Sequence, residues 1–253
     1  MAIKPLSKDD IVKMTRVCRL AAETLKYVEK YIRAGMTTNE IDQLVYDFTL
    51  THNAKPGPLG YLGFPKSICT SVNQVVCHGV PDETVLKEGD IINVDVTPVL
   101  DGFYGDTSAT FMIGKVSPQA RELVEAAREA MERGIGAITP NGYTGDIGFE
   151  INKYVTRKGY SAVKEIGGHG VGRIFHEDPF IPSFGKKGKG DRLIPFHCIT
   201  VEPMVNEGTE EIMEYPIPGS KHKYYHTADG KLSAQFEHTV LVTDTGYEVL
   251  TLA

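Results

Sequence analysis

The stretch VDVTPVLDGFYGDTS at residues 94–108 constrains the fold of this chain more than any other part of the sequence. It continues the apolar run IINV at residues 91–94, which is typical of a buried strand. The dipeptide Asp101-Gly102 lies near its centre, and such a pair is a strong signal for a tight hairpin turn. We therefore expect an antiparallel hairpin whose first strand is buried.

Two aspartates of this hairpin are expected on the same face of the sheet. Counting outward from the turn places Asp95 opposite Ser108 and Asp106 opposite Thr97, and all four side chains point the same way because side chains alternate between faces. The two aspartates are diagonal neighbours about 7–8 Å apart, and like charges there repel unless they are paired. A metal or catalytic site would explain them, but the hairpin alone equally allows a solvated tip with aspartates that serve the turn.

The composition is that of an ordinary folded protein. A chain of 253 residues can form one large domain or two small ones, and it contains 41% hydrophobic and 24% charged residues. The net charge of −6 argues against extensive nucleic-acid binding.

The cysteines and the N-terminus favour the cytoplasm. Cys18, Cys69, Cys77 and Cys198 form no CxxC pair and no regular spacing, which argues against a disulfide framework or a structural zinc site. The start MAIKPLSKDD lacks the apolar core of a signal peptide, and no apolar run approaches the roughly 18 residues of a membrane span. We expect a cytoplasmic protein without a membrane span.

Helices and strands are expected in an order that occurs twice. Ser7, Ser117 and Thr144 are candidate helix caps, and Gly35 and Gly159 are candidate helix ends. The apolar spacing predicts helices that begin near residues 8, 38, 118 and 144, and strands near 67–72, 91–97, 103–113, 161–166, 198–205 and 234–242. The glycine-rich stretches 53–65 and 183–192 are expected to be loops. This order suggests two related α+β halves, about 1–115 and 116–253.

Three further polar residues stand where solvated side chains are not expected. His169 lies among glycines in GGHGVG, Glu202 lies in ITVEPMV, and Glu237 lies in LSAQFEHTVLV. Around each glutamate, apolar residues occupy both the odd-numbered and the even-numbered positions, as in strands whose two faces are both covered. A glutamate is rarely fully buried unless it is paired.

Two divalent metal ions would account for all of these groups. Two dications a few ångströms apart need several anionic oxygens, and two of the carboxylates must bridge them. Oxygen-rich ligation with a single histidine suits Mn, Fe, Co or Zn. The candidate metal ligands are Asp95, Asp106, His169, Glu202 and Glu237.

The chain resembles the type I methionine aminopeptidases over essentially its full length. The matching stretches are FPKSICTSVNQVVCHGVPD, GDIINVDVTPVLDGFYGDTSATF, GGHGVGRIFHEDP, VEPMVNEG and LSAQFEHTVLVTDTGYEVLT. The resemblance implies the α+β pita-bread fold, in which two pseudo-symmetric halves surround a curved antiparallel sheet within a single catalytic domain, 1–253. It also implies a dimetal hydrolase that removes the N-terminal methionine from nascent proteins and peptides when the second residue is small and uncharged.

The resemblance assigns a role to each ligand. Asp95 would chelate one metal, while Asp106 and Glu237 would bridge both. His169 and Glu202 would bind the second metal. Glu202 would also act as the general base that takes a proton from the attacking water and passes it to the leaving amine.

Substrate-binding residues are implied in the same way. His78 and His176 match two histidines that hold the scissile amide and the developing oxyanion. An apolar pocket would hold the unbranched thioether side chain by packing and sulfur–aromatic contact. The residues at pocket positions are Tyr61, Phe64, Cys69 and Phe175.

Some positions depart from the family pattern at the pocket. Pro58 stands where cysteine is frequent. The chain has no Trp, so a Trp that some members place at the pocket mouth must be replaced, and Tyr224 in a lengthened segment 214–230 is the candidate.

The sequence leaves two alternative functions open. A proline-specific peptidase on the same scaffold would share all five ligands, but such enzymes normally carry an extra N-terminal domain, and only about 90 residues precede Asp95. A non-catalytic binding protein would be expected to have lost ligands.

The expected partners follow from the implied substrate. They are nascent N-termini and, transiently, the ribosome, which the loop Lys186–Lys189 could contact locally. The protein is expected to be a monomer without a specific nucleic-acid ligand. By the same substrate rule, the chain's own Met1-Ala2 is a candidate for cleavage.

Overall fold

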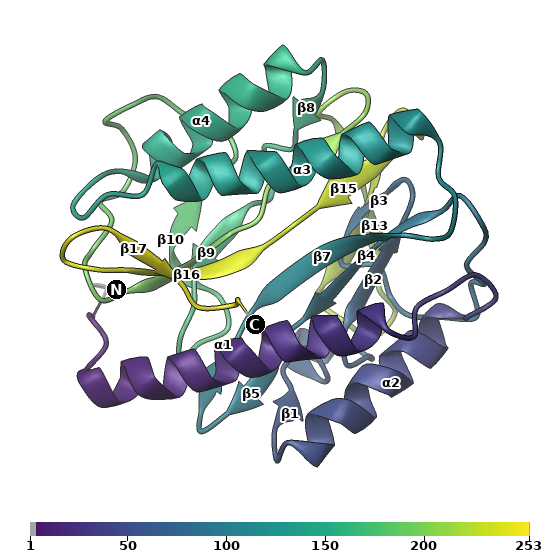
Figure 1. Ribbon diagram of the computed structural model, residues 1–253, viewed down its shortest axis with the longest axis horizontal. Helices are drawn as coiled ribbons and strands as arrows, with labels where there is room; N and C mark the ends of the chain where they lie inside the picture. The colour runs from purple at the N-terminus through teal and green to yellow at the C-terminus, as the bar shows by residue number, and fades with distance from the viewer. Residues whose placement is uncertain (1–3, 253) are drawn as a thin grey trace.

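The computed structural model describes residues 4–252, so Met1-Ala2 lies outside the described residues. Two helices precede a group of strands, and this order then occurs a second time, as predicted. In Figure 1 the long helices α1 and α3 run across the molecule on either side of the strands, with α2 beside α1 and α4 beside α3. The helices are α1 (Lys8–Glu29), α2 (Thr38–Thr51), α3 (Pro118–Gly136) and α4 (Thr144–Arg157), with a short 3₁₀ helix η1 (Tyr61–Gly63).

All strand pairs are antiparallel. Two sheets form the centre, with strand orders β2-β4-β7 and β10-β9-β11-β16-β17. A backbone bridge between Ser108 and Glu237 joins them, so the ends of strands from both halves meet at one place. The strands are β1 (Lys55–Pro56), β2 (Cys69–Val72), β3 (Val75–Cys77), β4 (Ile91–Val96), β5 (Pro98–Leu100), β6 (Phe103–Tyr104), β7 (Thr107–Met112), β8 (Ser161–Ala162), β9 (Gly168–Gly170), β10 (Glu177–Ile181), β11 (Cys198–Val201), β12 (Met204–Asn206), β13 (Ile212–Pro216), β14 (Lys223–Thr227), β15 (Ser233–Gln235), β16 (His238–Val242) and β17 (Tyr247–Val249).

The register of the central hairpin is the predicted one. Asp95 pairs with Ser108 in the β4–β7 ladder, and the Thr97 hydroxyl donates to the Asp106 carboxylate at 2.7 Å. The turn residue Asp101 has a φ of 53° and Gly102 has a φ of 79°. Two successive positive φ angles are those of a type I′ turn, whose twist matches that of the flanking strands.

The helices form where the apolar spacing and the caps predict them. The Ser7 and Ser117 hydroxyls accept hydrogen bonds from backbone N–H groups in the first turns of α1 and α3. The apolar face of α3 packs with α4 and with strands β11 and β16 in the largest core cluster, which includes Leu123, Ile151 and Val201. Burying one such side chain stabilises the fold by about 1.5–3 kcal/mol.

Two helix boundaries differ from the prediction. α1 ends at Glu29, ahead of Gly35, and a turn follows. Thr144 is the first residue of α4 rather than its cap, and Tyr143 occupies the cap position. The reason is long-range: the buried Thr144 exchanges hydrogen bonds with the backbone of Asp191, a contact that local sequence does not indicate.

The two glutamates lie at breaks between strands, whereas the sequence predicted them inside strands. Glu202 and Pro203 separate β11 from β12, and Glu237 lies between β15 and β16. Pro203 has no N–H to donate to a ladder, so the strand is interrupted there. Each break frees a carboxylate to turn toward the junction of the two sheets.

No helix within residues 4–252 is long and apolar enough to span a membrane.

Candidate active site

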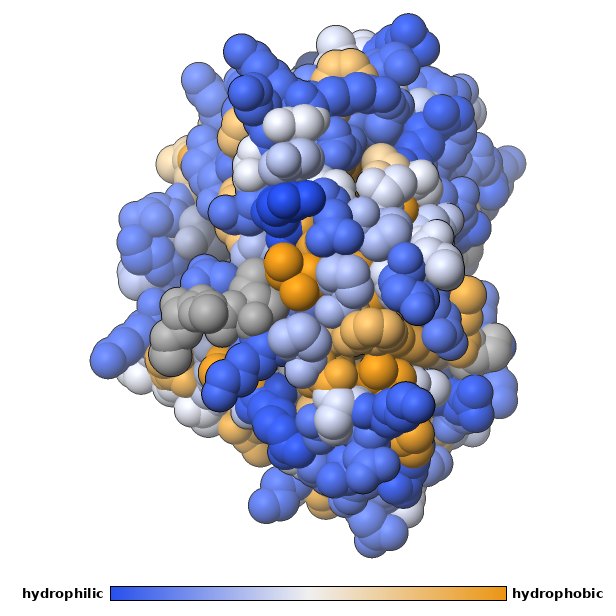
Figure 2. All heavy atoms as spheres, turned by 90° about the vertical axis from the view of Figure 1, so that its left-hand side faces the viewer, coloured by the Kyte–Doolittle hydropathy of each residue, from blue (hydrophilic) through white to orange (hydrophobic). Residues whose placement is uncertain are grey.

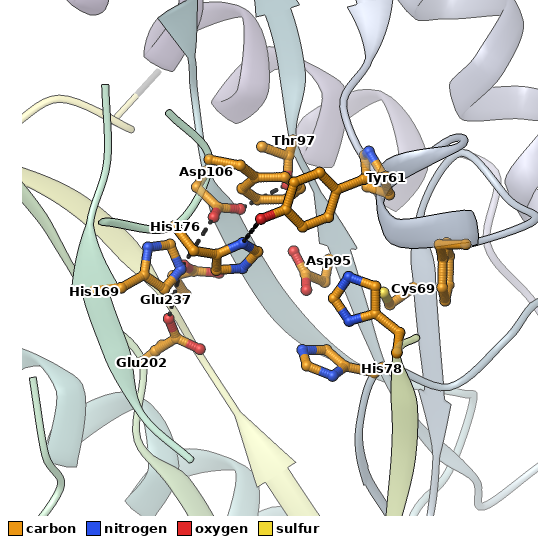
Figure 3. A pocket seen from close by; sticks show the side chains of 14 residues that line it. Tyr61, Cys69, His78, Asp95, Thr97, Asp106, His169, His176, Glu202 and Glu237 are labelled. Carbon is orange, nitrogen blue, oxygen red and sulfur yellow. Dashed lines mark hydrogen bonds and ion pairs between the residues drawn. The ribbon is translucent and has the colours of Figure 1, made fainter. Parts of the chain in front are cut away.

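All five predicted metal ligands line one pocket. Their side chains point toward one another from different elements (Figure 3). Asp95 lies in β4 and His169 in β9, while Asp106, Glu202 and Glu237 lie at the ends of strands. Ligand atoms of Asp106, His169 and Glu237 lie within 4.8 Å of one another, a spacing that can hold a metal ion.

Backbone and hydroxyl contacts position the two most buried carboxylates. Asp106 is 4% exposed and Glu237 is 2% exposed. The Glu237 N–H donates to the Ser108 carbonyl at 3.0 Å, and its carbonyl accepts from the Thr107 hydroxyl at 2.6 Å. The Thr239 hydroxyl donates to the Asp106 carbonyl at 2.7 Å. Their backbones are therefore fixed by groups from both sheets.

A buried threonine couples Glu202 to His169. The Thr200 hydroxyl accepts from the His169 backbone N–H at 2.9 Å and donates to Glu202 Oε1 at 2.8 Å. The other oxygen of Glu202 accepts from the Gln235 side-chain amide at 3.1 Å. Both carboxylate oxygens of Glu202 are thus oriented by the protein.

The tautomer of His169 suits metal ligation. Its Nδ1–H donates to the Gly170 carbonyl at 3.0 Å, because a carbonyl can only accept. Nε2 then carries a lone pair, and it lies 3.7 Å from Asp106 Oδ2 and 3.5 Å from Glu202 Oε1. Burial lowers the pKa of His169 to about 4, so the ring is neutral at pH 7. A neutral lone pair that faces two carboxylates is the arrangement expected around a cation.

The negative charge of the clustered carboxylates also indicates that a cation binds here. Burial is the largest cause that raises the pKa of each of the four carboxyl groups, and neighbouring carboxylates add to it for Asp95, Glu202 and Glu237. The pKa of Asp106 is raised to about 7, although its bond with Thr97 acts in the opposite direction. Among the described residues, His169 is the only basic side chain that lies in ion-pair range of these groups. Divalent metal ions fit this donor set, since they neutralise several oxygens at once.

These pKa shifts predict how metal stabilisation depends on pH. A carboxyl whose pKa is higher in the folded than in the unfolded protein stabilises the metal-free fold at low pH, and this contribution is lost as pH rises through the folded pKa. For Asp106, the stabilisation of the metal-free fold is lost over the pH range from about 4 to about 7. Metal binding requires the deprotonated groups, so the rise in melting temperature on adding Mn²⁺ to chelated protein should be larger at pH 7.5 than at pH 5.5. Calorimetric melting at both pH values measures this rise in melting temperature. A rise that stays constant or becomes smaller at higher pH would contradict the assignment of these carboxylates as metal ligands.

The apolar side of the pocket is formed by the residues predicted for it. The rings of Tyr61 and Phe175 lie 4.9 Å apart, and Tyr104 stacks on Phe175 from behind. Cys69 pairs with Asp95 in the β2–β4 ladder, which brings the pocket next to the carboxylates. Burial raises the pKa of Cys69 well above its usual value, so it lines the pocket as a neutral thiol. The predicted residues that line this side are Pro58, Tyr61, Phe64, Cys69 and Phe175.

His78 and His176 line the same pocket as the carboxylates and the apolar side chains. The Nδ1–H of His78 donates to the Lys223 carbonyl at 3.2 Å, which leaves Nε2 as an acceptor. Nδ1 of His176 lies 3.1 Å from the Tyr61 hydroxyl, and when that hydroxyl donates, Nε2–H of His176 is a donor. Burial is the largest cause that lowers the pKa of His78 to about 4 and that of His176 to about 2. The pocket therefore presents two neutral imidazoles, one suited to accept from an amide N–H and one suited to donate to an oxyanion.

The pocket mouth carries His222, which the sequence analysis missed. Its ring lies 5.6 Å from His78 and 5.4 Å from Tyr61. Tyr224, the predicted replacement for Trp, lies outside this pocket and stacks on Tyr215. In the sequence, His222 is only a histidine in a polar turn, and this pattern does not indicate a residue of the pocket.

Long-range contacts bring His222 to the mouth. The turn before it is tied to η1, because Lys221 N–H and the Ser220 hydroxyl both donate to the Leu62 carbonyl at 2.8 and 3.0 Å. Gly63 can approach Gly219 closely because it lacks a Cβ. These contacts place His222 in the lining of the pocket.

We expect His222 to contribute to substrate binding. Each aromatic contact stabilises by about 0.5–1.5 kcal/mol, so His222→Ala should raise KM for the substrate about 3–10-fold and leave the metal stoichiometry unchanged. Tyr224→Phe is the matched control and should leave KM unchanged. Steady-state kinetics measure both, and a larger effect of the Tyr224 change would restore the sequence-based assignment.

Comparisons with known proteins agree on the class. The fold and the buried carboxylate–histidine cluster are those of a metallopeptidase, and residues 12–244 match metallopeptidase family M24. Methionine aminopeptidase A of Synechocystis is 48% identical over 248 residues, which are 98% of this chain and 96% of the relative. The crystal structure of methionine aminopeptidase from Rickettsia prowazekii superposes with a TM-score of 0.96 at 44% identity, covering 99% of this chain and 100% of that one.

The chain therefore belongs to metallopeptidase family M24 and, within it, to the methionine aminopeptidases. A prolidase from Pyrococcus furiosus superposes with a TM-score of 0.78 at 20% identity, over 98% of this chain and 65% of that one, which shows a shared fold alone. The predicted pita-bread architecture is confirmed, and the protein is a divalent-metal peptidase.

Proposed function

We propose that this protein removes the N-terminal methionine from nascent proteins and peptides when the second residue is small and uncharged. The observation that carries the proposal is the pocket itself: five candidate metal ligands, buried or partly buried, form one side, and an apolar recess lined by aromatic rings and a thiol forms the other. The names of the similar proteins support the same substrate.

Two divalent metal ions, of Co, Mn, Fe or Zn, are proposed to occupy the carboxylate cluster. Asp95 would hold one ion, Asp106 and Glu237 would bridge both, and His169 and Glu202 would complete the second position. When bound, such ions supply Lewis-acid chemistry, polarising a carbonyl and making a water acidic enough to attack near neutral pH.

The protein's own groups would move the protons and orient the amide. Glu202, with both oxygens fixed and a raised pKa, is suited to accept the proton of the attacking water and to deliver it to the leaving amine. His78 Nε2 would accept from the scissile N–H, and His176 Nε2–H would donate to the developing oxyanion.

Pocket shape would set the substrate. A linear thioether can fill the recess, where sulfur–aromatic contacts favour it, while a β-branched side chain would clash and a shorter one would leave contacts unmade. Each missing methylene changes the activation free energy by about 1–3 kcal/mol, so norleucine should be tolerated and Ala or Val should be poor at the first position.

The experiment is a competition between peptides in one tube. Peptides that begin Met-Ala, Met-Gly or Met-Ser should release methionine far faster than Met-Leu, Met-Lys or Met-Phe, because bulk next to His78 and His176 displaces the amide. A displacement near 1 Å can cost about 100-fold. Mass spectrometry of free methionine gives the ratios directly.

Two results would overturn this substrate assignment. Equal rates for Met-Ala and Met-Phe peptides would indicate a broader peptidase. Faster removal of residues before proline would favour the proline-specific alternative on the same fold.

The cellular setting is part of the proposal. We propose that the chain acts in the cytoplasm as a monomeric single catalytic domain, with halves of about 1–115 and 116–253. Its substrates would be newly made chains, which places it transiently at the ribosome. No specific nucleic-acid sequence is expected to be recognised.

A further inference from the structure

A groove of about 870 Å³ lies behind the apolar recess and takes no part in the proposed function. It is lined by residues of β2, β3, the segment 79–87, the start of α2 and the β13–β14 hairpin. Of these elements, β2, β3, β13 and α2 lie toward the right of Figure 1. Small-molecule sites in proteins usually have volumes of about 300–1,000 Å³, so the groove is large enough for a ligand.

A thin wall separates this groove from the recess. Cys69 of β2 lines the recess (Figure 3), while its neighbour Thr70 lines the groove, because successive strand residues point to opposite faces. Tyr224, which the sequence had assigned to the pocket mouth, lies on the groove side of the wall. The side chains that pack together as this wall are Phe64, Cys69, Val80, Ile217 and Tyr224.

Thr70 brings an unpaired polar atom to the groove. It is 4% exposed, and its hydroxyl has no hydrogen-bond partner among the described residues. The Thr70 N–H donates to the Gly79 carbonyl at 2.8 Å, and Thr70 pairs with Val94 in the β2–β4 ladder, so its backbone is fixed. A buried hydroxyl without a partner destabilises a fold. A ligand that hydrogen-bonds to Thr70 would remove this cost.

The rest of the groove lining is apolar with an excess of negative charge. Asp82 and Asp90 line it together with one lysine, Lys87. Burial lowers the pKa of His226, so this ring adds no positive charge at pH 7. An anion would be repelled here, whereas an apolar ligand with a cationic group complements the lining. The apolar and aromatic lining residues are Pro65, Val72, Val75, Val80, Val85, Pro216, Ile217, Pro218 and Tyr224.

Asp82 offers one carboxylate oxygen to such a cation. Its Oδ1 accepts from the Thr84 N–H at 2.8 Å and from the Thr38 hydroxyl at 3.2 Å, so Oδ2 is the oxygen that can meet a ligand. The backbone of Asp82 is held by the start of α2, since its N–H donates to the Thr38 hydroxyl at 2.8 Å and its carbonyl accepts from the Asn39 N–H at 2.9 Å. The carboxylate therefore has a fixed place in the lining.

We propose that this groove binds a small aromatic amine. The aromatic ring packs on Tyr224 and the apolar lining, the ammonium group pairs with Asp82, and a ring N–H donates to the Thr70 hydroxyl. The groove lies outside the catalytic pocket, so the proposal does not depend on the proposed function. A bound amine contacts the outer side of the wall whose inner side lines the recess.

The test is the binding of tryptamine to full-length, Mn²⁺-loaded protein, followed by the fluorescence anisotropy of its indole ring. The chain contains no Trp, so the indole signal comes from the probe alone. The metal ions neutralise the carboxylates of the catalytic pocket, which would otherwise attract the ammonium group. Tryptamine should bind with a dissociation constant below about 1 mM. Indole-3-acetate, the same ring with the opposite charge, should bind at least about tenfold more weakly.

Two variants remove the proposed polar contacts. Thr70→Val should weaken tryptamine binding about fivefold, and it should raise the melting temperature of the ligand-free protein because an unpaired buried hydroxyl is lost. Asp82→Asn keeps Oδ1 as an acceptor and should weaken binding about threefold through the loss of charge.

The matched control is Asp244→Asn, the same change at an exposed aspartate in the turn between β16 and β17. This turn lies at the left of Figure 1, and Figure 2 shows that end of the molecule, where hydrophilic side chains cover most of the surface. Asp244→Asn should leave tryptamine affinity within about twofold, since a single exposed charge there acts only at long range.

Three outcomes would overturn the proposal. Tryptamine could fail to bind at about 1 mM. Indole-3-acetate could bind as tightly as tryptamine, which would show that the negative charge of the groove selects nothing. His222→Ala could weaken tryptamine binding while Thr70→Val and Asp82→Asn do not, which would place the probe in the catalytic pocket.

Discussion

Replacing Glu202 by Gln should lower the turnover number of the metal-loaded protein at least about 100-fold, the lower end for loss of a general acid–base group. Gln keeps the shape and can still accept from Thr200, which donates to Glu202 at 2.8 Å. An amide cannot accept the proton of the attacking water or return it to the leaving amine. The effect should therefore fall on kcat, with KM for a Met-Ala-Ser peptide changed much less.

The control for this variant is Glu132→Gln, an exposed glutamate on α3 that should leave kcat unchanged. Metal content must be measured alongside the rates, because Glu202 is also a proposed ligand. If Glu202→Gln retained near-wild-type kcat at full metal loading, Glu202 would not be the base.

Removing either proposed bridging carboxylate should weaken metal binding at least about 100-fold, since even groups that only support a ligand change affinity by about 10–100-fold. Asp106→Asn and Glu237→Gln each remove a buried charge from between the two proposed metal positions. Because the pKa of Asp106 is raised to about 7, metal-free Asp106→Asn should also melt at a higher temperature than metal-free wild type above pH 7. Calorimetric titration with Mn²⁺ and thermal melting measure the two effects.

Asp101→Asn on the same hairpin is the matched control. Asp101 is exposed and pairs with Arg16 at 2.9 Å, and asparagine tolerates its positive φ. It should leave metal affinity unchanged. Unchanged affinity and stoichiometry in both Asp106→Asn and Glu237→Gln would rule out bridging.

Local sequence was sufficient where local chemistry determines geometry. Asp101-Gly102 predicted the turn because both residues tolerate positive φ, and the turn then determined which residues face each other across β4 and β7. The flanking apolar residues of Glu202 and Glu237 correctly indicated that these carboxylates are shielded from bulk water. The residue types alone suggested that the five candidate ligands form one metal site, and the family resemblance assigned a role to each of them.

Features that depend on distant segments could not be predicted in this way. The break at Glu237 depends on its bridge to Ser108 in the other half of the chain. His222 reaches the mouth because its turn is hydrogen-bonded to Leu62, and the start of α4 depends on Asp191. Such contacts join segments far apart in the chain, and neither residue spacing nor composition encodes them.

The most direct test of a metal-dependent methionine aminopeptidase is the rate of methionine release from Met-Ala-Ser as Mn²⁺ is added back to fully chelated protein. The account predicts no release without metal and a rise that reaches its plateau by about two equivalents, the stoichiometry of a dimetal site. Release that persists in the chelated protein, or a fully metal-loaded protein that frees no methionine, would contradict it.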